Sequence, residues 1–139
     1  MLGEENYIRL VGGLARTSEL YAAGFWQSLL QWSMWYGTIV HVSRGWWATP
    51  DTPELAIRAR RAGGRLACVS ALQLYGEPVG DDVLHVAFER SSKGPRHPDV
   101  VAHWSRRRLP GTRLAVSVEV AREQAERCPY NQSRLRNDQ

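Results

Sequence analysis

Glycines divide the first fifty residues into short segments, and this division limits what can fold there. Gly12-Gly13, Gly24, Gly37 and Gly45 each follow such a segment. Glycine readily adopts the left-handed backbone conformation that ends a helix or turns a hairpin. The chain is therefore expected to begin with several short elements rather than with one long helix.

The segments before Gly37 have the patterns of three short helices. Residues 4–11 place apolar side chains at helical spacing, and Thr17 or Ser18 can cap a second helix that ends before Gly24. Residues 25–36 form the third predicted helix. The junction between the second and third helices is tight.

Residues 38–48 alternate apolar and polar side chains with a period of two, and Arg44-Gly45 lies where a hairpin can turn. Three short helices followed by a β-hairpin predict a winged helix-turn-helix. We expect it to occupy residues 1–50.

A proline-rich segment over residues 49–53 marks the boundary to a second subdomain. The sequence pattern of this second subdomain predicts helices over 53–61, 66–75 and 118–128 and strands over 83–88, 100–104 and 114–116. The expected fold class is α+β. We expect the winged helix-turn-helix over 1–50, a small α/β subdomain over 51–129 and a flexible tail over 130–139.

Positive charge is concentrated after residue 50. The chain has 18 Lys+Arg and 14 Asp+Glu, a formal net charge of +4, and residues 1–50 contribute three Arg and three Glu. This balance agrees with nucleic-acid contact without requiring it. Arg106, Arg107 and Arg108 lie between two predicted strands and are candidates for contact with phosphates or an acidic partner; the alternative is a solvated loop.

The third predicted helix contains no Lys or Arg. Gln27, Ser28 and Gln31 fall on one face, where they can read adenine edges, but the phosphate-driven part of DNA affinity is missing from this helix. Arg44 of the hairpin is a further candidate for DNA contact.

The same helix has more aromatic side chains than one buried face can hide. Leu29 and Leu30 already supply an apolar stripe, and a buried stripe covers roughly 100° of a helix. Some of the remaining aromatic surface is expected to be exposed and to suit contact with another protein. Its residues are Trp26, Trp32, Trp35 and Tyr36. The alternative is that the tryptophans all pack against the hairpin and the second subdomain.

No pattern of catalytic or metal-binding residues is recognisable. Cys68 and Cys128 lie far apart and match no zinc-ligand spacing, so we expect buried, reduced thiols. His85, His97 and His103 are irregularly spaced, and no cysteine or carboxylate is expected to complete a metal site with them. We therefore predict no metal, no other cofactor, no small-molecule substrate and no enzymatic activity.

The sequence has no apolar stretch of membrane-spanning length, and its N-terminus lacks the basic region of a signal peptide. We expect a cytoplasmic protein without membrane insertion.

Several segments, taken in order, resemble the AbiEi-type antitoxin family, and in particular its actinobacterial and mycobacteriophage members. The run over residues 63–72 is the most specific part of the match. The other matching segments are residues 12–24, Arg44-Gly45-Trp46-Trp47-Ala48, Arg61-Ala62, Tyr75-Gly76, Leu84-His85-Val86 and His103-Trp104.

The resemblance implies a winged helix that binds promoter DNA and an antitoxin of a type IV toxin-antitoxin, abortive-infection system that represses its own operon. Many related chains continue into a nuclease-like domain. The resemblance places the start of that domain near residues 121–128, so its catalytic carboxylates are expected to have no counterpart here.

Two functions follow. The first is a DNA-binding, antitoxin-like transcriptional regulator whose partner is double-stranded DNA. The alternative is a protein-interaction module of a phage or prophage defence system, acting in abortive infection or superinfection exclusion. Its aromatic third helix would hold a toxin, another defence component or a second copy in a homodimer.

Overall fold

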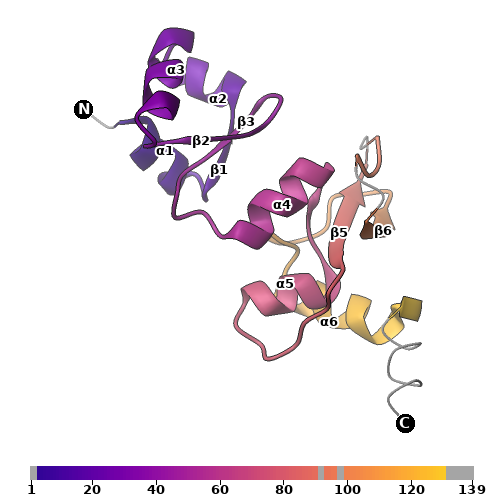
Figure 1. Cartoon of the computed structure of the whole chain (residues 1–139). Helices are drawn as coiled ribbons and strands as arrows, with labels where there is room; N and C mark the ends of the chain where they lie inside the picture. Colours follow the sequence, from indigo (N-terminus) through magenta and orange to yellow (C-terminus); the bar gives the residue numbers. More distant parts are fainter. Residues whose placement is uncertain (1–2, 91–92, 97–98, 131–139) are drawn as a thin grey trace.

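The computed structural model describes residues 3–90, 93–96 and 99–130 of the chain. Over these ranges the protein has six helices and two three-stranded sheets (Figure 1). The expected α+β fold class is confirmed at this level.

The first sheet and three helices form the N-terminal part. Their order along the chain is α1 (Glu4–Leu10), β1 (Leu14–Arg16), α2 (Thr17–Ala22), α3 (Gln27–Trp35), β2 (Val40–Ser43) and β3 (Trp46–Ala48). The sheet order is β1-β3-β2, and both pairings are antiparallel. In Figure 1 the three helices lie around this small sheet.

The predicted hairpin is confirmed, because β2 and β3 pair and Gly45 turns between them with φ +81°. The three helices are also confirmed. The third begins at Gln27 rather than Phe25, because Trp26 has extended backbone and is the helix N-cap. Strand β1 was not predicted, since three residues are too few to establish a period.

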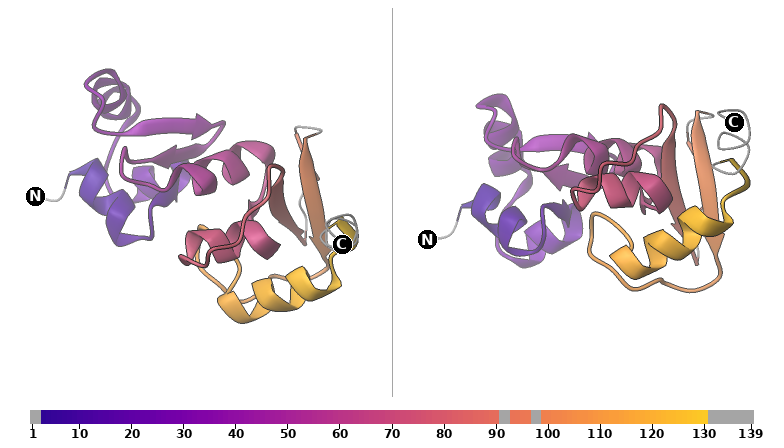
Figure 2. Two further views of the ribbon diagram at one scale, coloured as in Figure 1. Left: turned by 60° about the horizontal axis from the view of Figure 1, so that its bottom comes forward. Right: turned by 90° about the horizontal axis from the view of Figure 1, so that it is seen from below.

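The second sheet and the remaining helices form the C-terminal part. They are α4 (Glu54–Ala62), β4 (Arg65–Leu66), α5 (Cys68–Leu74), β5 (Leu84–Glu89), β6 (Val100–Ser105) and α6 (Val118–Arg127). The sheet order is β4-β5-β6, with β4 antiparallel and β6 parallel to β5. Helices α5 and α6 lie side by side next to this sheet in both views of Figure 2.

Two predicted elements need correction. The helix predicted from Leu66 begins at Cys68, because Leu66 pairs with β5 before the chain turns. The strand predicted over 114–116 is reduced to isolated bridges from Ala115 to Leu66 and from Val116 to Gly111. Of the tail, Tyr130 is still helical and packs edge-on against His85, and residues 131–139 lie outside the described residues.

Each part has its own apolar core. Leu20, Leu30 and Trp47 belong to the N-terminal core, whereas Val86 and Phe88 of β5 lie at the centre of the C-terminal core. A smaller cluster joins the two parts, because Ile57 of α4 packs with Leu14, Val42 and Ala48 of the first sheet. Burial of this apolar surface favours a fixed arrangement of α4 on that sheet.

Polar contacts reinforce the same junction. The predicted boundary at residues 49–53 is packed: Thr52 Oγ1 donates to the Gly13 carbonyl over 2.8 Å. Arg61 of α4 donates to the Val42 carbonyl over 3.1 Å. None of the helices in the described ranges is both long and apolar enough to cross a bilayer.

Candidate functional site

Helix α3 presents an aromatic surface, which we define as Trp26, Trp32, Trp35 and Tyr36. Their exposed fractions are 58, 59, 84 and 71%. Trp32 and Tyr36 stack with ring centroids 5.8 Å apart. The prediction of exposed aromatics is confirmed, and the alternative that all tryptophans are packed away is wrong, because α3 buries only Leu30 completely.

The three polar residues predicted to contact DNA lie on this surface. Gln27, Ser28 and Gln31 are exposed and, together with Trp26 and Trp32, line an open hollow of about 460 Å³. The prediction that they share one face is confirmed. The same hollow therefore combines hydrogen-bonding groups with two indole rings.

Arg44 is exposed at the tip of the β2–β3 hairpin. The hairpin tip lies against α2, since the Thr17 amide donates to the Gly45 carbonyl over 3.0 Å. Nearby, Trp47 Nε1 donates to Thr17 Oγ1 over 2.8 Å. These two hydrogen bonds tie the hairpin to the start of α2.

A basic cleft of about 350 Å³ lies where the two parts meet. The residues that line it include six arginines and one lysine but a single carboxylate: Arg16, Arg60, Arg65, Lys93, Arg96, Arg108, Arg113 and Glu89. Trp46 also lines the cleft. Its cations come from the N-terminal part and, in the C-terminal part, from α4, β4 and loops.

Two of these arginines are neutralised by carboxylates. Arg65 binds Glu89 through Nε and Nη2, at 2.7 and 2.9 Å, and also donates to the Leu109 and Thr112 carbonyls. Burial raises the pKa of Glu89, but the hydrogen bonds from Arg65 and the Leu109 amide outweigh it and hold that pKa below its ordinary value. Arg113 also binds its partner Glu19 with two hydrogen bonds, through Nη1 and Nη2.

The other five cations of the cleft form no ion pair with any residue in the described ranges. They are Arg16, Arg60, Lys93, Arg96 and Arg108. Guanidinium groups without carboxylate partners, gathered in one concavity, create a positive potential that attracts anions.

Arg60 is the central member of this group. Its guanidinium lies over the Trp46 ring at 4.5 Å from the centroid, and Arg16 lies over the same ring at 5.0 Å. Within the described chain its buried Nε has no hydrogen-bond partner. Burial, followed by repulsion from Arg16 and Arg96, lowers the pKa of Arg60 to about 10.

The predicted arginine triplet divides between two environments. All three side chains are exposed, but only Arg108 lines the basic cleft. Arg106 and Arg107 lie in the turn that follows β6.

Sequence reasoning missed most of the cleft. The spacing of α4 held one signal, because Arg60 follows the buried Ala56 and Ile57 at helical intervals and therefore falls on the buried face. An arginine on an apolar face is unusual. Arg16 and Arg96 gave no comparable signal, since Arg16 ends the three-residue strand β1, Arg96 lies in a loop, and both are far along the chain from Arg60.

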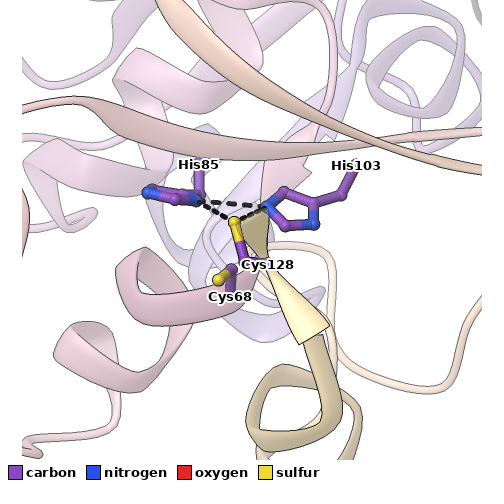
Figure 3. Close-up of side chains that lie close together, drawn as sticks. All are labelled: Cys68, His85, His103 and Cys128. Atoms are coloured by element: carbon purple, nitrogen blue, oxygen red, sulfur yellow. Dashed lines mark hydrogen bonds between the residues drawn. The ribbon is translucent and has the colours of Figure 1, made fainter. Parts of the chain in front are cut away.

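A second group of chemically active side chains lies inside the C-terminal part. Figure 3 shows Cys68, His85, His103 and Cys128 converging, and their ligand atoms all lie within 4.8 Å of one another. His85 Nδ1 is 3.1 Å from His103 Nε2, and Cys128 Sγ is 4.0 and 3.9 Å from these two atoms.

The expectation that no cysteine or carboxylate completes a set with the histidines is wrong. Cys68 at the start of α5 and Cys128 after α6 reach the same point as His85 and His103 of the neighbouring strands. Burial, followed by the nearby His85, lowers the pKa of His103 to about 4. His97 lies outside the described residues.

Comparison of the sequence with models of known protein families and with curated proteins gives no match.

Proposed function

We propose that this protein is a DNA-binding, antitoxin-like transcriptional regulator that contacts the phosphates of double-stranded DNA with its basic cleft. The observation that carries the proposal is the gathering, around one concavity, of five cations that form no ion pair within the described part of the chain. Repulsion between Arg60 and its neighbours disfavours this arrangement in the free protein. A bound phosphate relieves that repulsion and supplies an acceptor for the Arg60 Nε.

The N-terminal part supports the same function. Its element order and its sheet order β1-β3-β2 support the winged helix-turn-helix that the sequence predicts, in which α3 would be the recognition helix. Gln27, Ser28 and Gln31 are exposed there and offer amide and hydroxyl groups to base edges. Because α3 has no cation, the basic cleft supplies the phosphate-dependent part of the affinity, with Arg44, Arg106 and Arg107 as further contacts.

The test is fluorescence anisotropy with labelled DNA from upstream of the protein's own gene, measured over a series of salt concentrations. The wild-type affinity should fall with salt, and Arg60→Met and Arg96→Ala should each lower the slope of log K against log salt by about 1. The matched control is Arg58→Ala, which removes an exposed arginine from α4 that does not line the cleft.

An equal effect of Arg58→Ala and Arg60→Met would mean that only net charge matters, and it would reject the cleft as the binding site. No binding of this DNA at low salt would reject the regulator function itself.

The exposure of the aromatic surface favours a second candidate function, a protein-interaction module. Four large aromatic side chains at 58 to 84% exposure on one helix resemble the centre of a protein interface before the partner binds. A second copy of the chain is the simplest partner, since identical surfaces can pack on each other in a homodimer. A toxin or another defence component is the other partner that fits this function.

Sedimentation equilibrium tests the homodimer. Trp32→Ala combined with Trp35→Ala should convert a dimer to a monomer, whereas Leu10→Ala, which removes a side chain 76% exposed on α1, should leave it dimeric. A monomeric wild-type protein at high concentration would exclude self-association as the role of this surface.

A further inference from the structure

The buried histidines and cysteines have the composition of a zinc site. Cys68, His85, His103 and Cys128 supply two sulfur and two nitrogen ligands, one of the donor sets typical of tetrahedral structural zinc. We propose that these four residues bind one Zn²⁺ ion, which holds together the C-terminal part of the protein. The proposal is independent of the DNA-binding function.

The distances between the ligand atoms suit a single ion. Zn–N and Zn–S bonds of about 2.1 and 2.3 Å place the ligand atoms of a tetrahedron roughly 3.3 to 3.8 Å apart. His85 Nδ1 and His103 Nε2 are 3.1 Å apart, and Cys128 Sγ is 4.0 and 3.9 Å from them. Shifts of a few tenths of an ångström bring these three atoms to zinc distances, and Cys68 lies within 4.8 Å of each of them.

A carboxylate orients one of the ligands. His85 Nε2 donates to Asp81 Oδ2 over 2.9 Å, and both side chains are almost completely buried. With its proton on Nε2, the neutral imidazole has its lone pair on Nδ1, which faces His103 and Cys128. A carboxylate behind a metal-binding histidine is the usual way in which proteins fix the tautomer and the ring orientation.

The backbone is strained at Cys68, the first of the four proposed ligands along the chain. Cys68 has φ +54°, a left-handed conformation that costs a non-glycine residue energy. Its amide donates to Gln124 Oε1 of α6 over 2.9 Å, so this conformation is tied to the helix that carries Cys128. A strained residue persists only where its surroundings fix its conformation. At Cys68 the strained conformation occurs where the thiol meets the other three ligands.

The burial of the four residues indicates a structural rather than a catalytic metal. Three of them are buried and His103 is partly buried, and the four donor groups complete a tetrahedron without an open position. A cavity of about 600 Å³ lined by His103 and Cys128 gives the ion a path from solvent. The ion would link the start of α5, strands β5 and β6, and the end of α6.

The first experiment measures metal content. Protein purified under reducing conditions is incubated with Zn²⁺, desalted and analysed by mass spectrometry for metals. One zinc per chain is expected for the wild type and for the control His41→Ala, whose histidine lies in the N-terminal hairpin. Cys68→Ser combined with Cys128→Ser should lose the metal. Wild-type protein without zinc, or the double variant with one zinc, would overturn the proposal.

The second experiment uses the wild-type fold and identifies the ligands directly. Co²⁺ added to metal-free protein should give the visible d–d bands of tetrahedral cobalt together with thiolate-to-metal charge transfer. A spectrum without thiolate bands would overturn the site. Asp81→Asn should still bind Zn²⁺, but on the order of 10 to 100 times more weakly in competition with a chromophoric chelator. Circular dichroism of each variant verifies that it has folded.

Discussion

The guanidinium of Arg113 donates two hydrogen bonds, each of 2.6 Å, to the carboxylate of Glu19, and so joins two residues that are 94 positions apart in the sequence. Glu19 belongs to α2 of the N-terminal part, whereas Arg113 precedes α6 in the C-terminal part. Arg113 also donates to the Leu14 carbonyl over 3.1 Å. The ion pair therefore fixes the two parts against each other beside the basic cleft.

This ion pair should make stability depend on pH. The hydrogen bond from Arg113 is the largest cause that holds the pKa of Glu19 below its ordinary value of 4.5. The stabilisation is therefore complete above pH 4.5 and is lost as the pH falls through the lowered pKa that Glu19 has in the folded protein. At neutral pH, Glu19→Gln should reduce the free energy of unfolding by about 1 kcal/mol. This value is near the upper end of the contributions that ion pairs at the protein surface make to stability.

Thermal denaturation of the wild type and Glu19→Gln at a series of pH values checks this prediction. The difference in melting temperature should be greatest at neutral pH and should shrink in acid. A difference that is independent of pH would show that the Glu19 charge does not stabilise the fold.

Two tryptophans should differ sharply in their effect on stability. Trp35 is 84% exposed, so Trp35→Ala should change the free energy of unfolding by less than about 0.5 kcal/mol. Trp47 is 6% exposed and hydrogen-bonded to Thr17, so Trp47→Ala should cost about 3 to 5 kcal/mol. Urea denaturation measures both. A large loss of stability in Trp35→Ala would mean that the aromatic surface serves the fold rather than a partner.

Much of the fold was predictable because it depends on local patterns. Glycines at the ends of segments and periods of two or 3.6 residues identified the helices and the hairpin of the N-terminal part. Strands β1 and β4 were missed because they have three and two residues. Such strands exist only through their pairing with distant strands, and no local pattern encodes them.

The aromatic surface and the Cys/His cluster differ in how far the sequence could predict them. Exposure of the tryptophans followed from counting apolar residues on one helix. The Cys/His cluster depends on the parallel register of β5 and β6, which pairs His85 with Val101. His103 lies two residues after Val101 in β6, so its side chain is on the same face of the sheet as that of His85. In the sequence, Cys68 precedes these two strands and Cys128 follows them. No spacing rule for zinc ligands covers this arrangement.

Gly64 should tolerate no side chain. A Cβ atom at this position would lie 2.1 Å from the Ala87 carbonyl oxygen, in the backbone of the adjacent strand β5. Gly64→Ala should therefore cost at least about 2 kcal/mol, because the backbone of β4 must move away from β5. Gly80→Ala is the control: its Cβ would meet only the Gln73 side chain at 3.5 Å, and stability should change by less than about 0.5 kcal/mol. Equal melting temperatures for the two variants would contradict the close approach of the strands.

Replacement of Arg60 should increase stability and weaken binding at the same time. Burial and the neighbouring Arg16 and Arg96 lower the pKa of Arg60 to about 10, so its charged form opposes folding at neutral pH. Arg60→Met keeps an apolar side chain against Trp46 and removes the charge. We expect the free energy of unfolding at low salt to rise by about 1 kcal/mol, since the lost cation–π contact with Trp46 offsets part of the gain.

The same substitution removes a phosphate contact from the proposed DNA-binding cleft. Affinity for DNA at low salt should fall about tenfold, which corresponds to about 1.4 kcal/mol. Inorganic phosphate should raise the melting temperature of the wild type more than that of Arg60→Met, because a bound anion stabilises the native state only where its site is intact. If a charge cluster serves only the fold, substitution of one of its members is not expected to increase stability. If Arg60→Met were destabilised and bound DNA as the wild type does, Arg60 would be a structural residue and the cleft would have no role in binding.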